Sequence, residues 1–208
     1  MKVNKTWGFS VIILVMTMFV AIPVYAVSPT EALAKAKAKI MGAKSLSADF
    51  TMTVGGNAIK GQILSKGKKF AITSNSTSSW YNGTDLYTYN PSAGETTVFK
   101  PTASELVEVN PLLYINSAAD FKATASKQKK AGTETVILLP VKKNSGIRSV
   151  TLELDAKTFL PRSIKIATSS GTTSTISVSG IKLNTSLADS QFEYPKAKYK
   201  NAKIIDMR

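Results

Sequence analysis

The sequence has no cysteine and no histidine, and arginine occurs only as Arg148, Arg162 and Arg208. The chain therefore lacks the thiolate and imidazole ligands that zinc, copper and haem sites commonly use. The most common general base of enzymes is also missing, and no acidic loop has the spacing of a calcium site. The composition indicates no metal and no cofactor. Without disulfides, the fold must depend on a substantial hydrophobic core.

Lysine supplies nearly all of a strongly basic charge, with 27 basic against 13 acidic residues. Arginine is the side chain suited to bidentate bonds with phosphates and base edges, so its scarcity argues against a nucleic-acid partner. Two interpretations of the lysines stay open. They attract the chain to anionic membranes or acidic partners, or they keep its surface soluble and its strand edges unpaired.

The first 26 residues predict a cleavable secretory signal. Lys2 and Lys5 precede an almost wholly apolar stretch, which ends at residues 23–26 with Pro-Val-Tyr-Ala. A charged start, an apolar stretch of about 15 residues and a small final residue are typical of such signals, whereas a membrane-spanning helix needs about 20 apolar residues. We expect cleavage near Ala26 and a single domain over residues 27–208. An uncleaved anchor is the alternative.

Local patterns after the signal predict a strand-rich chain with three short helices. Ser28 and Pro29 favour a helix that continues to Met41. From Ser47 onward polar and apolar residues alternate, and turn signals recur roughly every 8–15 residues, which indicates an antiparallel sheet of about ten strands. Residues 102–115 interrupt the alternation and predict two further helices. A sheet of this size must curl, and loosely covering helices would leave a partly vacant hydrophobic hollow.

Several short segments follow one another in a distinctive order. They are Ser-Leu-Ser-Ala-Asp-Phe at 45–50, Gly-Gln-Ile-Leu at 61–64, Trp-Tyr-Asn-Gly-Thr-Asp-Leu-Tyr-Thr-Tyr-Asn-Pro at 80–91, Asn-Pro-Leu-Leu at 110–113, Leu-Leu-Pro-Val-Lys at 138–142, Leu-Pro at 160–161 and Phe-Glu-Tyr-Pro at 192–195. In this order and spacing the chain resembles the periplasmic outer-membrane lipoprotein carrier family (LolA-like). The resemblance covers nearly all of residues 27–208, although no single segment is a strong motif.

The resemblance implies a mainly β fold, in which a strongly curved antiparallel sheet forms an incomplete barrel and a few short helices cover it as a lid. It implies a periplasmic carrier that shields the acyl chains of lipoproteins in a hydrophobic cavity and shuttles them from the inner to the outer membrane. The implied partners are acylated lipoproteins, an inner-membrane lipoprotein-releasing transporter and an outer-membrane acceptor, with the carrier a monomer. The alternative is a periplasmic domain of the same half-barrel fold that senses lipids or lipoproteins.

One departure from the family pattern marks a divergent branch. Family members carry an arginine after the second strand that tethers the lid, whereas residues 66–69 of this chain read Lys-Gly-Lys-Lys. Lys66 or Lys68 is the candidate substitute. A lysine, however, lacks the planar fork with which arginine bonds several carbonyl groups at once.

The lipid-binding cavity is expected to be lined by alternating apolar residues of the strands and by the apolar mid-chain helix. These residues are Phe50, Met52, Ile63, Phe70, Trp80, Tyr87, Tyr89, Phe99, Leu112, Leu113, Ile115, Leu152, Leu154, Ile164 and Ile166. The alternative is that each of them is ordinary core. An enzyme is not expected: Ser-x-x-Lys occurs at 65–68 and 126–129, but both copies lie in turn-like stretches and the motifs that accompany it in penicillin-recognising enzymes are missing.

Overall fold

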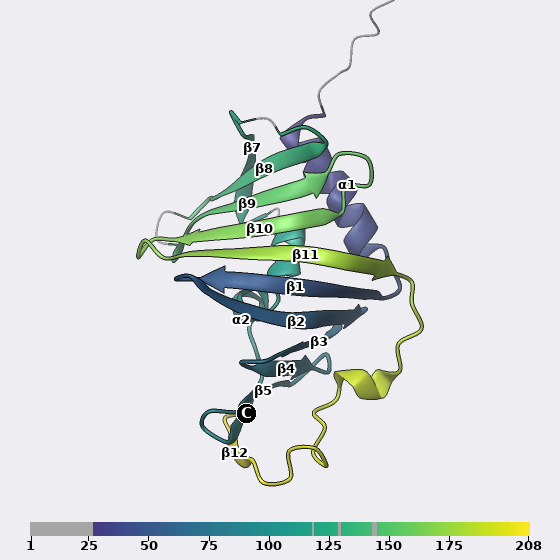
Figure 1. Cartoon of the computed structure of the whole chain (residues 1–208), viewed down its shortest axis with the longest axis vertical. Helices are drawn as coiled ribbons and strands as arrows, with labels where there is room; N and C mark the ends of the chain where they lie inside the picture. Colours follow the sequence, from purple (N-terminus) through teal and green to yellow (C-terminus); the bar gives the residue numbers. More distant parts are fainter. Residues whose placement is uncertain (1–26, 118, 129, 143–144) are drawn as a thin grey trace, which may run out of the picture.

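The computed structural model describes residues 27–208 except 118, 129 and 143–144. Its described strands form one sheet in the order β12-β6-β5-β4-β3-β2-β1-β11-β10-β9-β8-β7 (Figure 1). Their bounds are β1 Leu46–Val54, β2 Asn57–Lys66, β3 Lys69–Ser74, β4 Ser78–Tyr81, β5 Leu86–Asn90, β6 Glu95–Phe99, β7 Phe121–Ala125, β8 Thr133–Pro140, β9 Ile147–Asp155, β10 Pro161–Thr168, β11 Thr173–Leu183 and β12 Lys203–Asp206. The strands pair antiparallel except β12, which runs parallel to β6. The sheet is curved and does not close, so the predicted incomplete barrel is confirmed.

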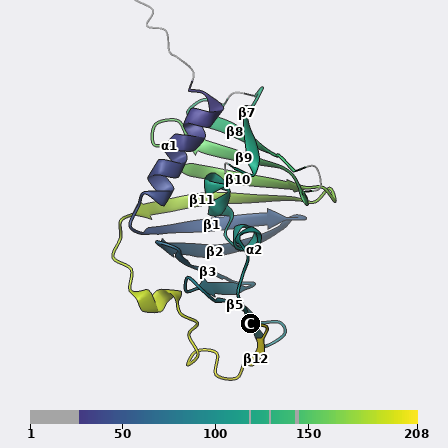
Figure 2. The same ribbon diagram turned by 180° about the vertical axis from the view of Figure 1, so that it is seen from behind.

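The helices lie on one side of the sheet, which we call the helix face (Figure 2). They are α1 (Pro29–Met41), α2 (Ala103–Val109) and the 3-10 helix η1 (Pro111–Asn116). All three helices were predicted from the sequence, with the start of η1 at Pro111, whereas α2 is capped by Thr102 and begins at Ala103. A further short 3-10 helix, η2 (Asp189–Phe192), lies on the other side of the sheet. No helix in the described part of the chain is long and apolar enough to cross a membrane.

The alternation of the sequence decides which side chains reach the helix face. In β9, Val150, Leu152 and Leu154 are fully buried there, while Thr151 and Glu153 between them point to the opposite side. Full burial of each aliphatic side chain contributes about 1.5–3 kcal/mol to folding. Together with the buried apolar residues of the neighbouring strands, these side chains form a continuous apolar floor beneath the helices.

The opposite side of the sheet is covered in part by residues 184–202, which we call the C-terminal strap. Phe192 and Tyr194 of the strap are buried against Ala71 and Trp80, in a hydrophobic cluster separate from that of the helix face. The Tyr194 hydroxyl lies 2.9 Å from the Thr96 hydroxyl, with which it shares a hydrogen bond. The strap then leads into β12 at the end of the sheet (Figure 1). The described part of the chain thus has two hydrophobic clusters, one on each side of a single sheet.

Gly61 of β2 has no side chain, so the ring of Phe50 on the neighbouring strand β1 lies directly against its backbone. A methyl group at this position would lie 2.2 Å from the Thr73 carbonyl oxygen and 2.6 Å from the Phe50 ring. We expect Gly61→Ala to reduce the free energy of unfolding by about 1–3 kcal/mol, because the ring and the strand must shift to admit it. Urea unfolding measures this loss. Gly146→Ala is the matched control, since no atom lies within 4 Å of the added carbon, and an equal loss in both variants would contradict the close contact.

Candidate functional site

Helix α1 packs against β7 and β8, extends along the sheet towards β11 and turns one apolar stripe toward the sheet (Figure 2). Ser28 caps its first turn by accepting a hydrogen bond from the Glu31 amide at 3.2 Å. Ala32, Leu33, Ala36 and Ile40 form the buried stripe, and their spacing is that of one face of a helix. This helix is therefore a firmly packed part of the cover.

The second part of the cover consists of two short helices, α2 and η1, of which α2 is the less firmly held. The side chain of Thr102 and that of Glu105 cap the start of α2 reciprocally, and this bonding holds the pKa of the Glu105 carboxyl below its usual value. No residue of α2 is buried. Asn110 then caps η1 by accepting a hydrogen bond from the Leu112 amide at 3.2 Å. The capping bonds within α2 and η1 are local, and α2 contacts η1 and packs against the hydrophobic cluster of the helix face through the half-buried Val107.

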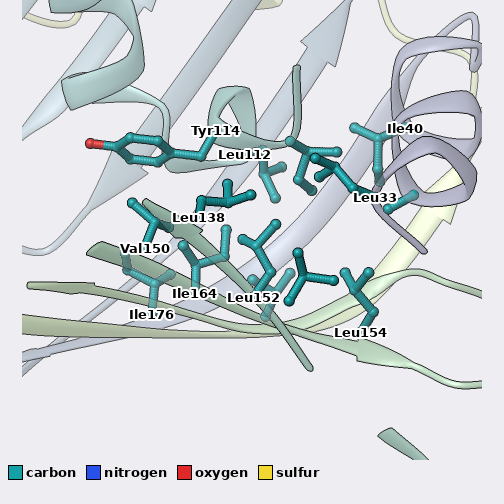
Figure 3. Close-up of a cluster of buried hydrophobic side chains, with 14 of the residues drawn as sticks. Leu33, Ile40, Leu112, Tyr114, Leu138, Val150, Leu152, Leu154, Ile164 and Ile176 are labelled. Carbon is teal, nitrogen blue, oxygen red and sulfur yellow. The ribbon is translucent and has the colours of Figure 1, made fainter. Parts of the chain in front are cut away.

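Helix η1 fills the space between α1 and the sheet. Leu112, Tyr114 and Ile115 are almost completely buried and join α1 and the strands in one hydrophobic cluster (Figure 3). The Tyr114 ring packs edge-on against Phe121, with 5.8 Å between the ring centres. Burial, with a smaller contribution from the charge of Glu108, raises the pKa of the Tyr114 hydroxyl. The expected vacant hollow is thus occupied by the side chains of the protein itself, because the apolar faces of both helices reach the floor.

A small gap remains where the two parts of the cover meet. It is a cavity of about 60 Å³ between the end of α1, the turn from β2 to β3, and η1. Met41 and Leu113 lie along it on the two helices, and Lys68 lies along it on the turn. Met41 is one of the few exposed large apolar side chains of the described chain, and Leu113 is half-buried. The gap is therefore bordered by apolar side chains that are not part of the packed core.

The strand register places most of the predicted cavity residues on the helix face. Phe50, Ile63, Leu112, Ile115, Leu152, Leu154 and Ile164 belong to the buried cluster there, and Met52 and Ile166 pack against it. Phe70 and Phe99 are on the same side, on strands outside that cluster. Leu113 lies at the gap. Whether any of them contacts lipid remains a prediction.

Three predicted residues lie on the wrong side for a shared cavity. Trp80, Tyr87 and Tyr89 belong to the strap cluster. Their neighbours in β4 and β5, Tyr81 and Leu86, pair with each other and point to the helix face. The period of two separates neighbouring aromatic residues onto opposite sides of a sheet. The sequence prediction counted aromatic residues of both sides as one surface, and for these three it was wrong in position.

Lys66 does not tether the lid in place of the missing arginine. Its Nζ donates to the Leu187 carbonyl at 2.9 Å and to Asp189 at 2.8 Å, on the strap side of the sheet. These bonds, with a further one from Lys69, hold the pKa of Asp189 below its usual value. Lys66 therefore fastens the strap. Lys68 is exposed and lies along the gap, so it is the remaining candidate for a contact with the lid.

The structure adds residues to the site that the predicted list omitted. They share burial on the helix face and come from α1, β8, β9 and β11: Leu33, Ile40, Val136, Leu138, Val150, Ile176 and Val178. The same alternation that selected Leu152 and Leu154 identifies the strand members. The stripe of α1 was recognised in the sequence, but its contact with the sheet becomes visible only in three dimensions.

Comparison with known proteins identifies the family. The sequence model of the family described as "Outer membrane lipoprotein carrier protein LolA" matches residues 25–170. The chain belongs to this LolA family. No curated protein matches it.

Several solved structures are similar to this chain at low sequence identity. An uncharacterised conserved protein of Thermus thermophilus is similar with a TM-score of 0.57 and 11% identity, over 85% of this chain and 98% of the other. A LolA superfamily protein of Nitrosomonas europaea has a TM-score of 0.45 and 14% identity, over 81% and 99%. A putative outer membrane lipoprotein-sorting protein domain of Vibrio parahaemolyticus has a TM-score of 0.46 and 13% identity, over 82% and 97%. The first of these likenesses supports the fold assignment.

Proposed function

We propose that this protein is a periplasmic carrier that shields the acyl chains of lipoproteins between its helices and its sheet. The observation that carries the proposal is the continuous apolar surface shared by α1, η1 and the strand floor, in a chain that belongs to a lipoprotein carrier family. Each buried methylene contributes about 0.8 kcal/mol, so acyl chains cross an aqueous compartment only when they are covered.

Acyl chains require more room than the gap of about 60 Å³ provides. We propose that α2 and η1 move away from the sheet as one unit, and that acyl chains enter at Leu113 and Met41. The absence of buried residues from α2 supports this motion. Opening would expose the side chains of Leu112 and Ile115, which costs free energy. Much of the free energy gained by burying the acyl chains would offset this cost, so the net free energy of binding would be small. A small net affinity of this kind suits a carrier that must release its cargo.

The proposed partners follow from this role. They are acylated lipoproteins, an inner-membrane transporter that releases them and an outer-membrane acceptor, and the carrier acts as a monomer without nucleic acid. The lysine-rich surface is compatible with transient docking to acidic partners, because exposed charges mainly change association rates and salt dependence.

Native mass spectrometry of protein released gently from the cell envelope tests the proposal. We expect a fraction of the molecules to carry a lipidated polypeptide, and depletion of the protein to leave lipoproteins at the inner membrane after fractionation. Normal lipoprotein sorting in depleted cells, together with cargo-free protein, would contradict the carrier. Normal sorting with bound lipoprotein would instead support the sensor.

A further inference from the structure

A second cavity lies on the strap side of the sheet and shares no residue with the gap beside η1. Its volume is about 340 Å³, which is in the lower range of pockets for small molecules. Tyr87 of β5, Val98 of β6 and Ile204 of β12 contribute apolar surface to it. Residues of the strap line the cavity as well, so the strap is needed to form it.

Three stacked tyrosine rings line one side of this cavity. The rings of Tyr87 and Tyr194 are parallel within 2°, with 5.3 Å between their centres. The rings of Tyr194 and Tyr199 are parallel within 12°, with centres 5.8 Å apart. Tyr194 is buried and hydrogen-bonded to Thr96, so the arrangement is fixed by the packing of the strap. These stacked rings form a tyrosine wall, against which an aromatic ring or an extended hydrocarbon body can pack.

Three of the other lining residues are cationic. Lys196 and Lys200 line the cavity and are exposed, and neither takes part in an ion pair among the residues that the structure describes. Arg208 also lines the cavity, but it is already paired with Asp85 at 2.9 Å and with Asp206 at 2.6 Å. The two lysines therefore supply uncompensated positive charge beside an apolar surface.

We propose that this cavity binds a small anionic amphiphile, in which a carboxylate or phosphate group is attached to an apolar or aromatic body. The body would lie against Ile204 and the tyrosine wall, and the anionic group would be paired with Lys196 and Lys200. Charge-assisted hydrogen bonds to an ammonium group are among the stronger polar contacts of proteins. The site is separate from the proposed lipoprotein site, since the sheet lies between them. Most of its residues also lie outside residues 25–170, which the family model matches.

The test uses protein expressed with its complete sequence and purified after export, and decanoate below its micelle-forming concentration as the probe. Isothermal titration is expected to show a saturable site for decanoate and decyl phosphate that is retained when the lid site is blocked by Leu113→Glu, with about tenfold weaker binding of the neutral decanol to it. Trp80 reports the location, because its ring centre lies 5.6 Å from that of Tyr199 and it is the only tryptophan of residues 27–208. Its fluorescence should change along the same binding curve.

Two paired substitutions and one lid variant complete the design. The double variant Lys196→Gln and Lys200→Gln should weaken decanoate binding about tenfold, whereas Lys60→Gln with Lys165→Gln, two exposed lysines elsewhere on the sheet, should leave it unchanged. Leu113→Glu at the gap should also leave it unchanged. If both double variants weaken decanoate binding equally, the lysines act only through general electrostatic attraction, and the proposal is overturned. Loss of decanoate binding in Leu113→Glu alone would place the ligand under the lid and overturn the proposal too, and no saturable binding in the wild type would overturn the site without affecting the lipoprotein proposal.

Discussion

Leu113→Glu is expected to reduce the binding of a fluorescent acyl probe, and of a triacylated lipopeptide, by more than tenfold at neutral pH. Leu113 is half-buried at the gap between the two parts of the cover, where we propose that acyl chains enter. A carboxylate at this position would have to lose its water to an incoming hydrocarbon chain, and burying an unpaired charge costs several kcal/mol. In the closed molecule the same carboxylate can remain hydrated, so the free energy of unfolding should change much less than the free energy of binding. Probe titration and urea unfolding measure the two quantities side by side.

The control is Val141→Glu, which makes the same kind of change at a side chain that is 64% exposed and lies beyond the end of β8. It should leave both binding and unfolding unchanged. If Leu113→Glu lowers stability by more than it weakens binding, Leu113 is ordinary core and the proposed route of entry is wrong. The contrasting variant Ile115→Glu should unfold the protein, because Ile115 is completely buried and its surroundings are apolar.

The local elements of this fold could be read from the sequence because each depends on neighbouring residues. The cap at Ser28 with Pro29 identified the start of α1, and the alternation at Val150, Leu152 and Leu154 identified β9. Asn82 marked the hairpin between β4 and β5, where its side chain accepts hydrogen bonds from the next turn residues. The order of such elements was sufficient for the fold and the family.

The composition of the site was less predictable because it depends on which side of the sheet each strand turns toward the helices. Trp80, Tyr87 and Tyr89 alternate correctly within their strands, but the sequence contains no signal that the strap will cover them. The filled interior was also missed. The number of apolar residues on η1 indicated contact with something apolar, but it does not tell whether that is cargo or the protein's own floor.

The two hydrophobic clusters imply that stability and cargo binding can be changed separately. Side chains of the helix face contribute to both properties, since they pack against each other in the closed molecule and are the proposed surface for acyl chains. Side chains of the strap cluster contribute to stability but not to the proposed lipoprotein binding, because the whole sheet separates them from the helices. A large substitution under the strap therefore tests whether the sheet keeps its curvature and its helix face without the strap.

Phe192→Ala is that substitution, and we expect it to lower the free energy of unfolding by about 3–5 kcal/mol. Phe192 is completely buried among Ala71, Trp80 and Tyr194, and removing its ring would leave a cavity that η2, held through Lys66 and Asp189, cannot easily close. Urea unfolding gives the loss, and Trp80 emission should shift to longer wavelength as water reaches the indole.

Met207→Ala serves as the control, since Met207 is 59% exposed in the same C-terminal region and its substitution should cost little. Acyl binding per folded molecule should be unchanged in Phe192→Ala, because the helix face and the gap at Leu113 contain no residue of the strap. A loss of acyl binding at full stability would show that the strap, rather than the helices, takes part in holding cargo, and the roles of the two sides of the sheet would have to be exchanged.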